Sequence, residues 1–263
     1  MFEYAFFQRA FIAGILSGGV CGALSVYIVA KRMAFIGEGI SHAAFGGVTL
    51  GLLLGISPPL TAALFAIAMA IGISVLSKRG DIHRDTIIGV LLAGSMALGV
   101  LFLSFAKTYT GAVMSYLFGN ILAVNKTDLL ILVAITVLTI SFIWAFYKEL
   151  KFYSFDERIA RIYGIPVGKI EIGLLVLIAL AIIASIQVVG VILVTAFLVV
   201  PGAIAVLFAR NFRTLIVIAC IVGILSAIAG LTVSYFLDIP SGATIALLLS
   251  LAFLVSKIVK GKS

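Results

Sequence analysis

The longest apolar run of this chain reads IEIGLLVLIALAIIASIQVVGVILVTAFLVVPGAIAVLF, at residues 170–208. Almost nothing interrupts its apolar run except Gln187 and Gly190. A helix rises about 1.5 Å per residue and the hydrocarbon layer of a membrane is about 30 Å thick. A single helix over these residues would be nearly twice as long as the hydrocarbon layer is thick. The stretch therefore predicts two membrane-spanning helices with a turn at 187–190.

The whole chain has the composition of a membrane protein. Of its 263 residues, 63% are hydrophobic and 11% are charged, and the mean hydropathy is +1.33. A soluble domain carries about 25% charged residues, and a chain of a few hundred residues buries only about three quarters of its unfolded surface. We therefore predict an all-α, polytopic membrane helix bundle that forms one transmembrane domain over residues 1–263.

Further apolar runs of about 20 residues repeat this pattern along the chain. Together with the hairpin they predict about eight to nine membrane-spanning helices, at roughly 10–30, 34–56, 60–77, 86–106, 127–147, 170–187, 190–209, 214–237 and 241–258. Residues 112–123 are apolar but too short to cross comfortably. With Tyr116 and Phe118 they predict a re-entrant or interfacial helix.

The basic residues predict an orientation. If the loops alternate and the chain is cytoplasmic after the first span, only Arg9, Lys107 and Lys126 lie outside, and the other 15 of the 18 lie inside. This asymmetry predicts a cell (inner) membrane protein with a cytoplasmic C-terminus. The formal charge of +8 indicates contact with membrane lipid and not with nucleic acid, because the basic residues lie singly and in pairs between apolar runs.

Motifs for nucleotide binding and catalysis do not occur in the sequence. The nearest P-loop string, GIPVGKI at 164–170, is one residue short and lacks the hydroxyl that meets magnesium. Only two histidines exist, without a nucleophile elbow or an HExxH motif, and Cys21 and Cys220 lie apart in apolar stretches. The sequence predicts no enzyme, so any use of ATP requires a partner.

One ionisable pair lies within an apolar segment. Glu38 and His42 are four residues apart and share a face on a helix. Such a pair is costly in a membrane, and carboxylate with imidazole suits zinc, manganese or iron. The alternative is structural: Glu38 pairs with Lys31 or Arg32, and His42 is hydrogen-bonded in the bundle. His83 differs, because its charged loop predicts a solvated side chain.

Two segments on the predicted cytoplasmic side are candidate docking surfaces. Residues 148–169 are rich in charge, and residues 201–213 read PGAIAVLFARNFR. The second predicts a short amphipathic helix that begins at Pro201 and is held at the membrane surface by Arg210 and Arg213. Either segment could be a simple connection. Glycines spaced four apart at 14, 18 and 22 and at 47, 51 and 55 predict close helix packing.

Five strings in order resemble the zinc/manganese/iron-type permease family of ABC transporters: KRMAFIGEGISHAAFGG (31–47), SYLFGNIL (115–122), FDERIARIYGIP (155–166), VGVILVTAFLVVPGAIA (189–205) and DIPSG (238–242). The resemblance covers essentially the whole chain. It implies the vitamin/metal-importer type of ABC permease fold and the membrane subunit of a metal importer. Two permease copies would form the pathway, with an ATP-binding subunit dimer inside and a metal-binding receptor outside.

The resemblance also implies roles for single residues. Glu38 and His42 match the family's motif of an acid followed four residues later by histidine, although Asp is frequent where this chain has Glu. They would contact the transported zinc, manganese or iron, with no tightly bound cofactor. The coupling helix would lie at 201–213, and Asp238 and Ser241 would face the receptor. ATPase contacts would come from Pro201, Ala205, Ala209, Arg210 and Arg213.

Two other functional classes remain as alternatives. An ion-gradient-driven secondary carrier would show inverted repeats and buried carboxylates near the middle of the membrane. The chain offers one buried acid in a motif and no convincing repeat. A membrane scaffold without a transport cycle is the third class. Asp238 has an alternative reading too, as a residue that ends a helix.

Overall fold

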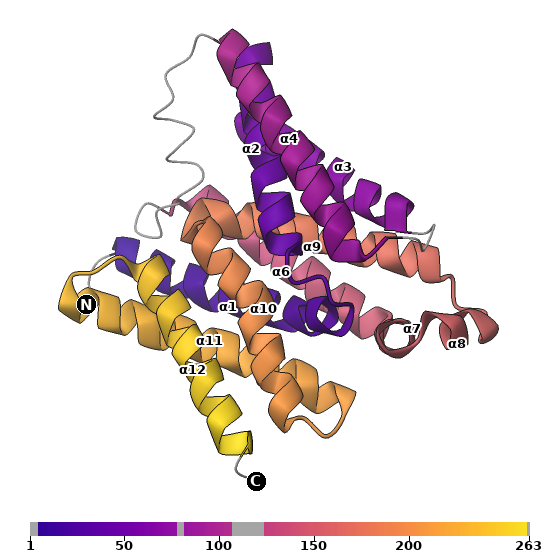
Figure 1. Cartoon of the computed structure of the whole chain (residues 1–263). Helices are drawn as coiled ribbons and strands as arrows, with labels where there is room; N and C mark the ends of the chain where they lie inside the picture. Colours follow the sequence, from indigo (N-terminus) through magenta and orange to yellow (C-terminus); the bar gives the residue numbers. More distant parts are fainter. Residues whose placement is uncertain (1–4, 78–81, 107–123, 262–263) are drawn as a thin grey trace. The chain divides into compact units, whose positions relative to one another are not determined.

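The computed structural model describes residues 5–77, 82–106 and 124–261, and all regular elements in these ranges are helices (Figure 1). The short helices are α7 (Tyr147–Phe155) and α8 (Glu157–Ile162). The long helices are α1 (Ala5–Ala30), α2 (Ile36–Leu54), α3 (Pro58–Ser77), α4 (Arg84–Ala106), α6 (Lys126–Ala145), α9 (Val167–Val189), α10 (Val191–Phe208), α11 (Phe212–Leu237) and α12 (Ser241–Gly261).

Within the described ranges, eight helices are long and apolar enough to cross a membrane. They are all the long helices except α2, whose 19 residues include Glu38 and His42. The prediction of an all-α membrane protein with eight to nine spans is confirmed. The interfacial helix that we predict at 112–123 lies outside the described residues.

The break between α9 and α10 lies where the longest apolar run predicts it. Gly190 separates the two helices and has φ 81°, a left-handed conformation that favours glycine. The helices on either side have 23 and 18 residues, and each of them matches the thickness of a bilayer. The predicted break is therefore present, and Gly190 is the residue at which one helix ends and the next begins.

One compact unit of the chain comprises residues 1–31, 118–140 and 184–263. In it α1 packs against α10 and α11, and α12 packs against the same two helices. A Cβ atom added to Gly18 would lie 2.5 Å from the Gly223 carbonyl oxygen, and one added to Gly22 would lie 2.6 Å from that of Ala219. The predicted close packing is confirmed at these two glycines.

The other unit comprises residues 32–117 and 141–183. Here α2 packs against both α3 and α4 (Figure 1). A Cβ on Gly47 would lie 2.6 Å from the Thr61 carbonyl oxygen, so α2 and α3 are also in backbone contact. Gly55 differs from the prediction. It ends α2 with φ 67° and has nothing within 4 Å of its added Cβ, so it is a helix cap and not a packing residue.

Candidate functional site

The candidate metal pair lies on the first two turns of α2. The Oε1 atom of Glu38 is 3.0 Å from the Nε2 atom of His42, as their spacing of four residues predicts. Glu38 also lies in the first turn of its helix, where the helix dipole favours a negative charge. The two side chains form one hydrogen-bonded unit.

Glu38 and His42 are the only partly exposed residues in an otherwise buried stretch of α2. From Ile36 to Thr49 all residues are buried except Glu38 and His42, whose side chains are 45% and 27% exposed. The helix surface beside the pair is packed so closely that a Cβ on Gly39 would lie 2.6 Å from the Cγ2 atom of Ile88 in α4. Glycine and alanine therefore bring the other helices close to α2, and the two potential metal ligands remain accessible.

The described residues offer two ligands here and not a complete metal site. No group of three or more His, Cys, Asp or Glu side chains that could hold a metal ion occurs among residues 5–77, 82–106 and 124–261. Structural zinc takes about four protein ligands, and divalent cations such as magnesium and calcium take about six to eight ligands. A carboxylate and an imidazole alone thus bind a divalent metal only in part, and a complete coordination shell needs further ligands.

The segment between α6 and α9 folds into α7 and α8. The Asp156 side chain accepts hydrogen bonds from the backbone N–H groups of Arg158 and Ile159, which fixes the start of α8. Large apolar side chains project outward from this corner. Phe155 is 74% exposed and Ile162 is 83% exposed, with Tyr163 and Ile159 exposed beside them. Apolar side chains exposed together next to charged ones are typical of a protein contact.

Arg84 is the centre of a polar cluster that our sequence analysis did not predict. Its Nη2 atom lies 2.7 Å from Glu157 and 3.0 Å from Glu171, and its Nη1 atom donates to the Tyr153 hydroxyl at 3.0 Å. Burial is the main reason that the pKa of Tyr153 is raised, so this phenol stays neutral. The available signal was Glu171, an acid at the start of an apolar span that we counted as uninterrupted.

The prediction that a short helix begins at Pro201 is wrong. Pro201 lies inside α10, which continues to Phe208, so no separate helix begins there. A proline interrupts one hydrogen bond of a helix, but membrane spans tolerate this because neighbouring helices pack around it. Pro201 and Ala205 are buried, and a Cβ on the intervening Gly202 would lie 2.6 Å from the Ser25 carbonyl oxygen of α1. The first half of the segment therefore belongs to α10, at the point where α10 packs against α1.

The second half of that segment lies at a surface. Ala209 follows the end of α10, and Asn211 caps α11 by accepting a hydrogen bond from the Thr214 backbone N–H. Arg210 and Arg213 are exposed on either side of this short connection. Of the predicted ATPase contacts, Ala209, Arg210 and Arg213 are thus accessible, whereas Pro201 and Ala205 are not.

The other predicted site residues lie at helix ends. Asp238 ends α11 with φ 53°, and Ser241 begins α12 two residues after Ile239. The reading of Asp238 as a residue that ends a helix is therefore confirmed, and a receptor contact stays a prediction. The loop residue His83 is exposed as predicted, and its carbonyl accepts hydrogen bonds from Thr86 and Ile87 at the start of α4.

Comparison with known proteins gives matches over nearly the whole chain. The manganese transport system membrane protein MntC of Listeria monocytogenes is 36% identical over 97% of this chain and 91% of the relative. The chelated iron transport system membrane protein YfeD of Yersinia pestis is 36% identical over 98% of this chain and 86% of the relative.

A solved structure and a family model agree with these relatives. The structure of PsaBC from Streptococcus pneumoniae in complex with Fab contains a chain that is 34% identical to this one. The two superpose with a TM-score of 0.84, covering 97% of this chain and 92% of that one. A model of the ABC 3 transport family matches residues 3–260. The chain belongs to the ABC 3 transport family.

Proposed function

We propose that the chain is the membrane permease of an ATP-driven importer of a divalent transition metal. The observation that carries the proposal is the Glu38–His42 pair, a carboxylate and an imidazole that are the only partly exposed residues in the otherwise buried stretch Ile36–Thr49 of α2. Oxygen and nitrogen ligands of this kind suit manganese, iron and zinc. ATP hydrolysis in an ABC transporter takes place on a separate subunit, so the chain is not itself an enzyme.

The metal is cargo, and the proposed contact with it is transient. Two protein ligands hold a divalent ion weakly enough to release it, whereas a complete tetrahedral site would retain it. A second permease copy in a homodimer would supply a matching pair, with water completing the coordination. Relatives named for manganese and for chelated iron are equally similar to the chain, at 36% identity, so both metals are candidates along with zinc.

The chain is a multi-pass membrane protein, and we place its C-terminus in the cytoplasm. The charge asymmetry of the loops supports this orientation. The Arg84 cluster agrees with the alternation of the loops, because it brings the start of α4 to Tyr153 of α7 and to Glu171 near the start of α9. These are the ends that an alternating topology assigns to the cytoplasmic side. Both units would belong to one permease domain, because one family model spans them.

The ATP-binding subunit dimer would dock on α7 and α8. This surface replaces 201–213 as the main contact, because Pro201 and Ala205 are buried in α10. Exposed Phe155 and Ile162 provide apolar area of the kind that dominates binding at the centre of interfaces. The exposed connection with Ala209, Arg210 and Arg213 would be a second, smaller contact on the same side of the membrane.

The extracytoplasmic receptor would approach the opposite side, where Asp238 and Ser241 join α11 to α12. A carboxylate and a hydroxyl on an exposed connection suit polar contacts at the rim of an interface. Membrane lipid covers the spans, and nothing in the charge distribution favours nucleic acid as a partner. Membership in an ABC family favours this mechanism over an ion-gradient-driven carrier.

Uptake of radiolabelled manganese, iron and zinc into cells that lack the permease gene, with and without the restored chain, tests this function. We expect restored uptake of at least one of the three metals, abolished when the ATPase subunit is inactivated. Uptake that persists without a functional ATPase subunit and stops when the proton gradient is dissipated would instead identify a secondary carrier.

A further inference from the structure

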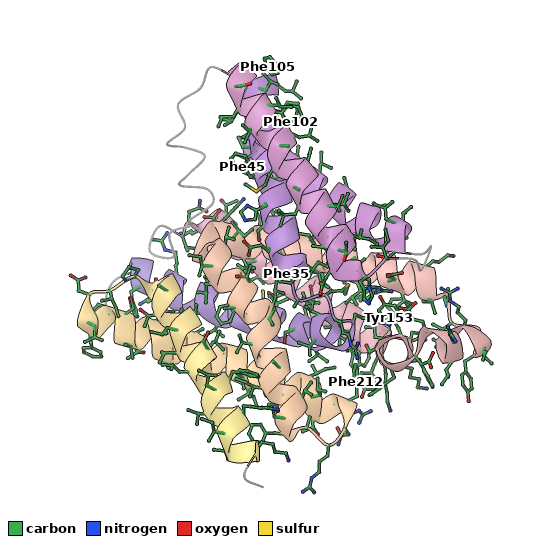
Figure 2. All side chains as sticks on the ribbon, viewed as in Figure 1. Phe35, Phe45, Phe102, Phe105, Tyr153 and Phe212 are labelled. Atoms are coloured by element: carbon green, nitrogen blue, oxygen red, sulfur yellow. The ribbon has the colours of Figure 1, made fainter. Side chains whose placement is uncertain are left out.

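The Arg84 side chain joins four segments of the unit formed by residues 32–117 and 141–183. It reaches Tyr153 of α7, Glu157 at the first residue of α8 and Glu171 of α9. Its Nη1 atom also lies 4.0 Å from the sulfur of Met33, which precedes α2. Figure 2 marks Tyr153 on α7. Because a guanidinium is planar and forked, it can bind several acceptors in a fixed geometry, which a lysine cannot do.

The cluster is partly enclosed. The Glu171 side chain is only 6% exposed, and Tyr153 and Met33 are buried. Charge-assisted hydrogen bonds in such surroundings are stronger than bonds between neutral groups. Glu157 is the more accessible partner, and it belongs to the segment that we propose as the ATPase docking surface. A displacement of α8 therefore acts directly on Arg84.

The helix that begins at Arg84 is packed rigidly against the helix that bears the metal pair. Gly39, next to Glu38, lies against Ile88, one turn after Arg84, with 2.6 Å between its added Cβ and the Ile88 Cγ2 atom. Further along, the Cβ of Gly46 would lie 3.0 Å from the Ser95 carbonyl oxygen, and that of Gly99 would lie 2.6 Å from the Phe45 ring. Figure 2 shows Phe45 at this contact. Helices in such close contact move together.

We propose that Arg84 transmits movement of α7 and α8 to the α2–α4 pair and so to Glu38 and His42. The path runs from Glu157 to Arg84, along α4 through Ile88, and across to α2. Arg84 is a positioning residue in this proposal and does not touch the metal. The proposal rests on the proposed function, because it takes α7 and α8 as the surface that the ATPase subunit moves.

A residue that transmits movement affects the coupling ratio, which is the amount of metal transported per ATP hydrolysed. A residue that merely stabilises the fold lowers the amount of complex but leaves this ratio unchanged. Glu157→Gln is the most selective variant, because it removes one charge from a partly exposed position and leaves Arg84 with Tyr153 and Glu171. Arg84→Lys is the second variant, since it keeps the charge but loses the fork.

The test measures the coupling ratio of the full transporter in proteoliposomes, with the ATPase subunit and the receptor present. We expect Glu157→Gln and Arg84→Lys to recover the ATPase subunit within twofold of wild type and to lower the ratio at least fivefold. Asp128→Asn is the matched control, because it makes the same acid-to-amide change at a partly exposed residue of α6, outside the docking surface and not among the partners of Arg84, and we expect an unchanged ratio.

Two results would overturn the proposal. One is a coupling ratio for Glu157→Gln equal to that of Asp128→Asn. The other is a loss of uptake by Glu157→Gln that only follows a loss of bound ATPase subunit. If Arg84→Lys fails to insert into the membrane, Glu157→Gln alone decides the question. Failure of the proposed function looks different, because the wild-type transporter itself would then move no metal.

Discussion

Replacing Gly18 by alanine would disturb the contact of α1 with α11. The added Cβ would lie 2.5 Å from the Gly223 carbonyl oxygen and 2.8 Å from its carbon, and both are backbone atoms that cannot rotate away. To restore an ordinary contact of 3.4 Å, the helices must separate by about 0.9 Å. Overpacking of this kind costs about 1–3 kcal/mol. Because 1 kcal/mol shifts the Tm of a chain of similar size by about 2–4 °C, we expect a Tm lower by about 2–12 °C.

The neighbouring glycine provides a matched control. A Cβ on Gly19 would meet only the side chain of Ile224, at 3.5 Å, so Gly19→Ala makes the same chemical change without a clash. Cys21 is buried in the same helix, and a dye that fluoresces on reaction with thiols reports its exposure during heating in detergent. We expect Gly19→Ala to unfold at the wild-type temperature or slightly above. Equal stability of Gly18→Ala and Gly19→Ala would refute the close approach of α1 and α11.

Two further predictions concern topology and docking. A cysteine in place of Lys151 or Lys260 should resist an impermeant thiol reagent in intact cells, whereas one in place of Lys126 should react, and the reverse pattern would overturn the orientation. Ile162→Asp should lower recovery of the ATPase subunit at least tenfold, because a charge would replace an apolar side chain that is buried on docking. Ile82→Asp, at another exposed isoleucine, should leave recovery unchanged, and equal recovery for both variants would remove α7–α8 as the docking surface.

The sequence was sufficient to place the spans and the pair. Apolar length fixes where a helix must end in a bilayer, which is why the break at Gly190 could be predicted. The Glu38–His42 contact could be predicted because residues four apart on a helix must face one another. Both predictions depend only on local geometry.

Two features could not be predicted from the sequence: the continuation of α10 through Pro201, and the cluster around Arg84. Pro201 looked like the start of a surface helix, but a span can continue through proline when neighbouring helices enclose it. The three polar partners of Arg84 follow it in the sequence by 69, 73 and 87 positions. No rule based on short sequence spacing could therefore indicate the cluster. Buried charges in a membrane protein acquire partners through tertiary packing, and that packing was the missing information.

The most direct test of the proposed function is metal uptake by variants of the exposed pair. Glu38→Gln keeps the shape and the hydrogen bond to His42 but removes the charge, and His42→Ala removes the nitrogen ligand. We expect each variant to insert, to recover its ATPase subunit and to lose at least about tenfold in uptake, because each change weakens one of the two potential metal ligands on α2. His83→Ala, in an exposed loop, should transport like wild type. Wild-type uptake by both Glu38→Gln and His42→Ala would contradict a role of this pair in the metal pathway.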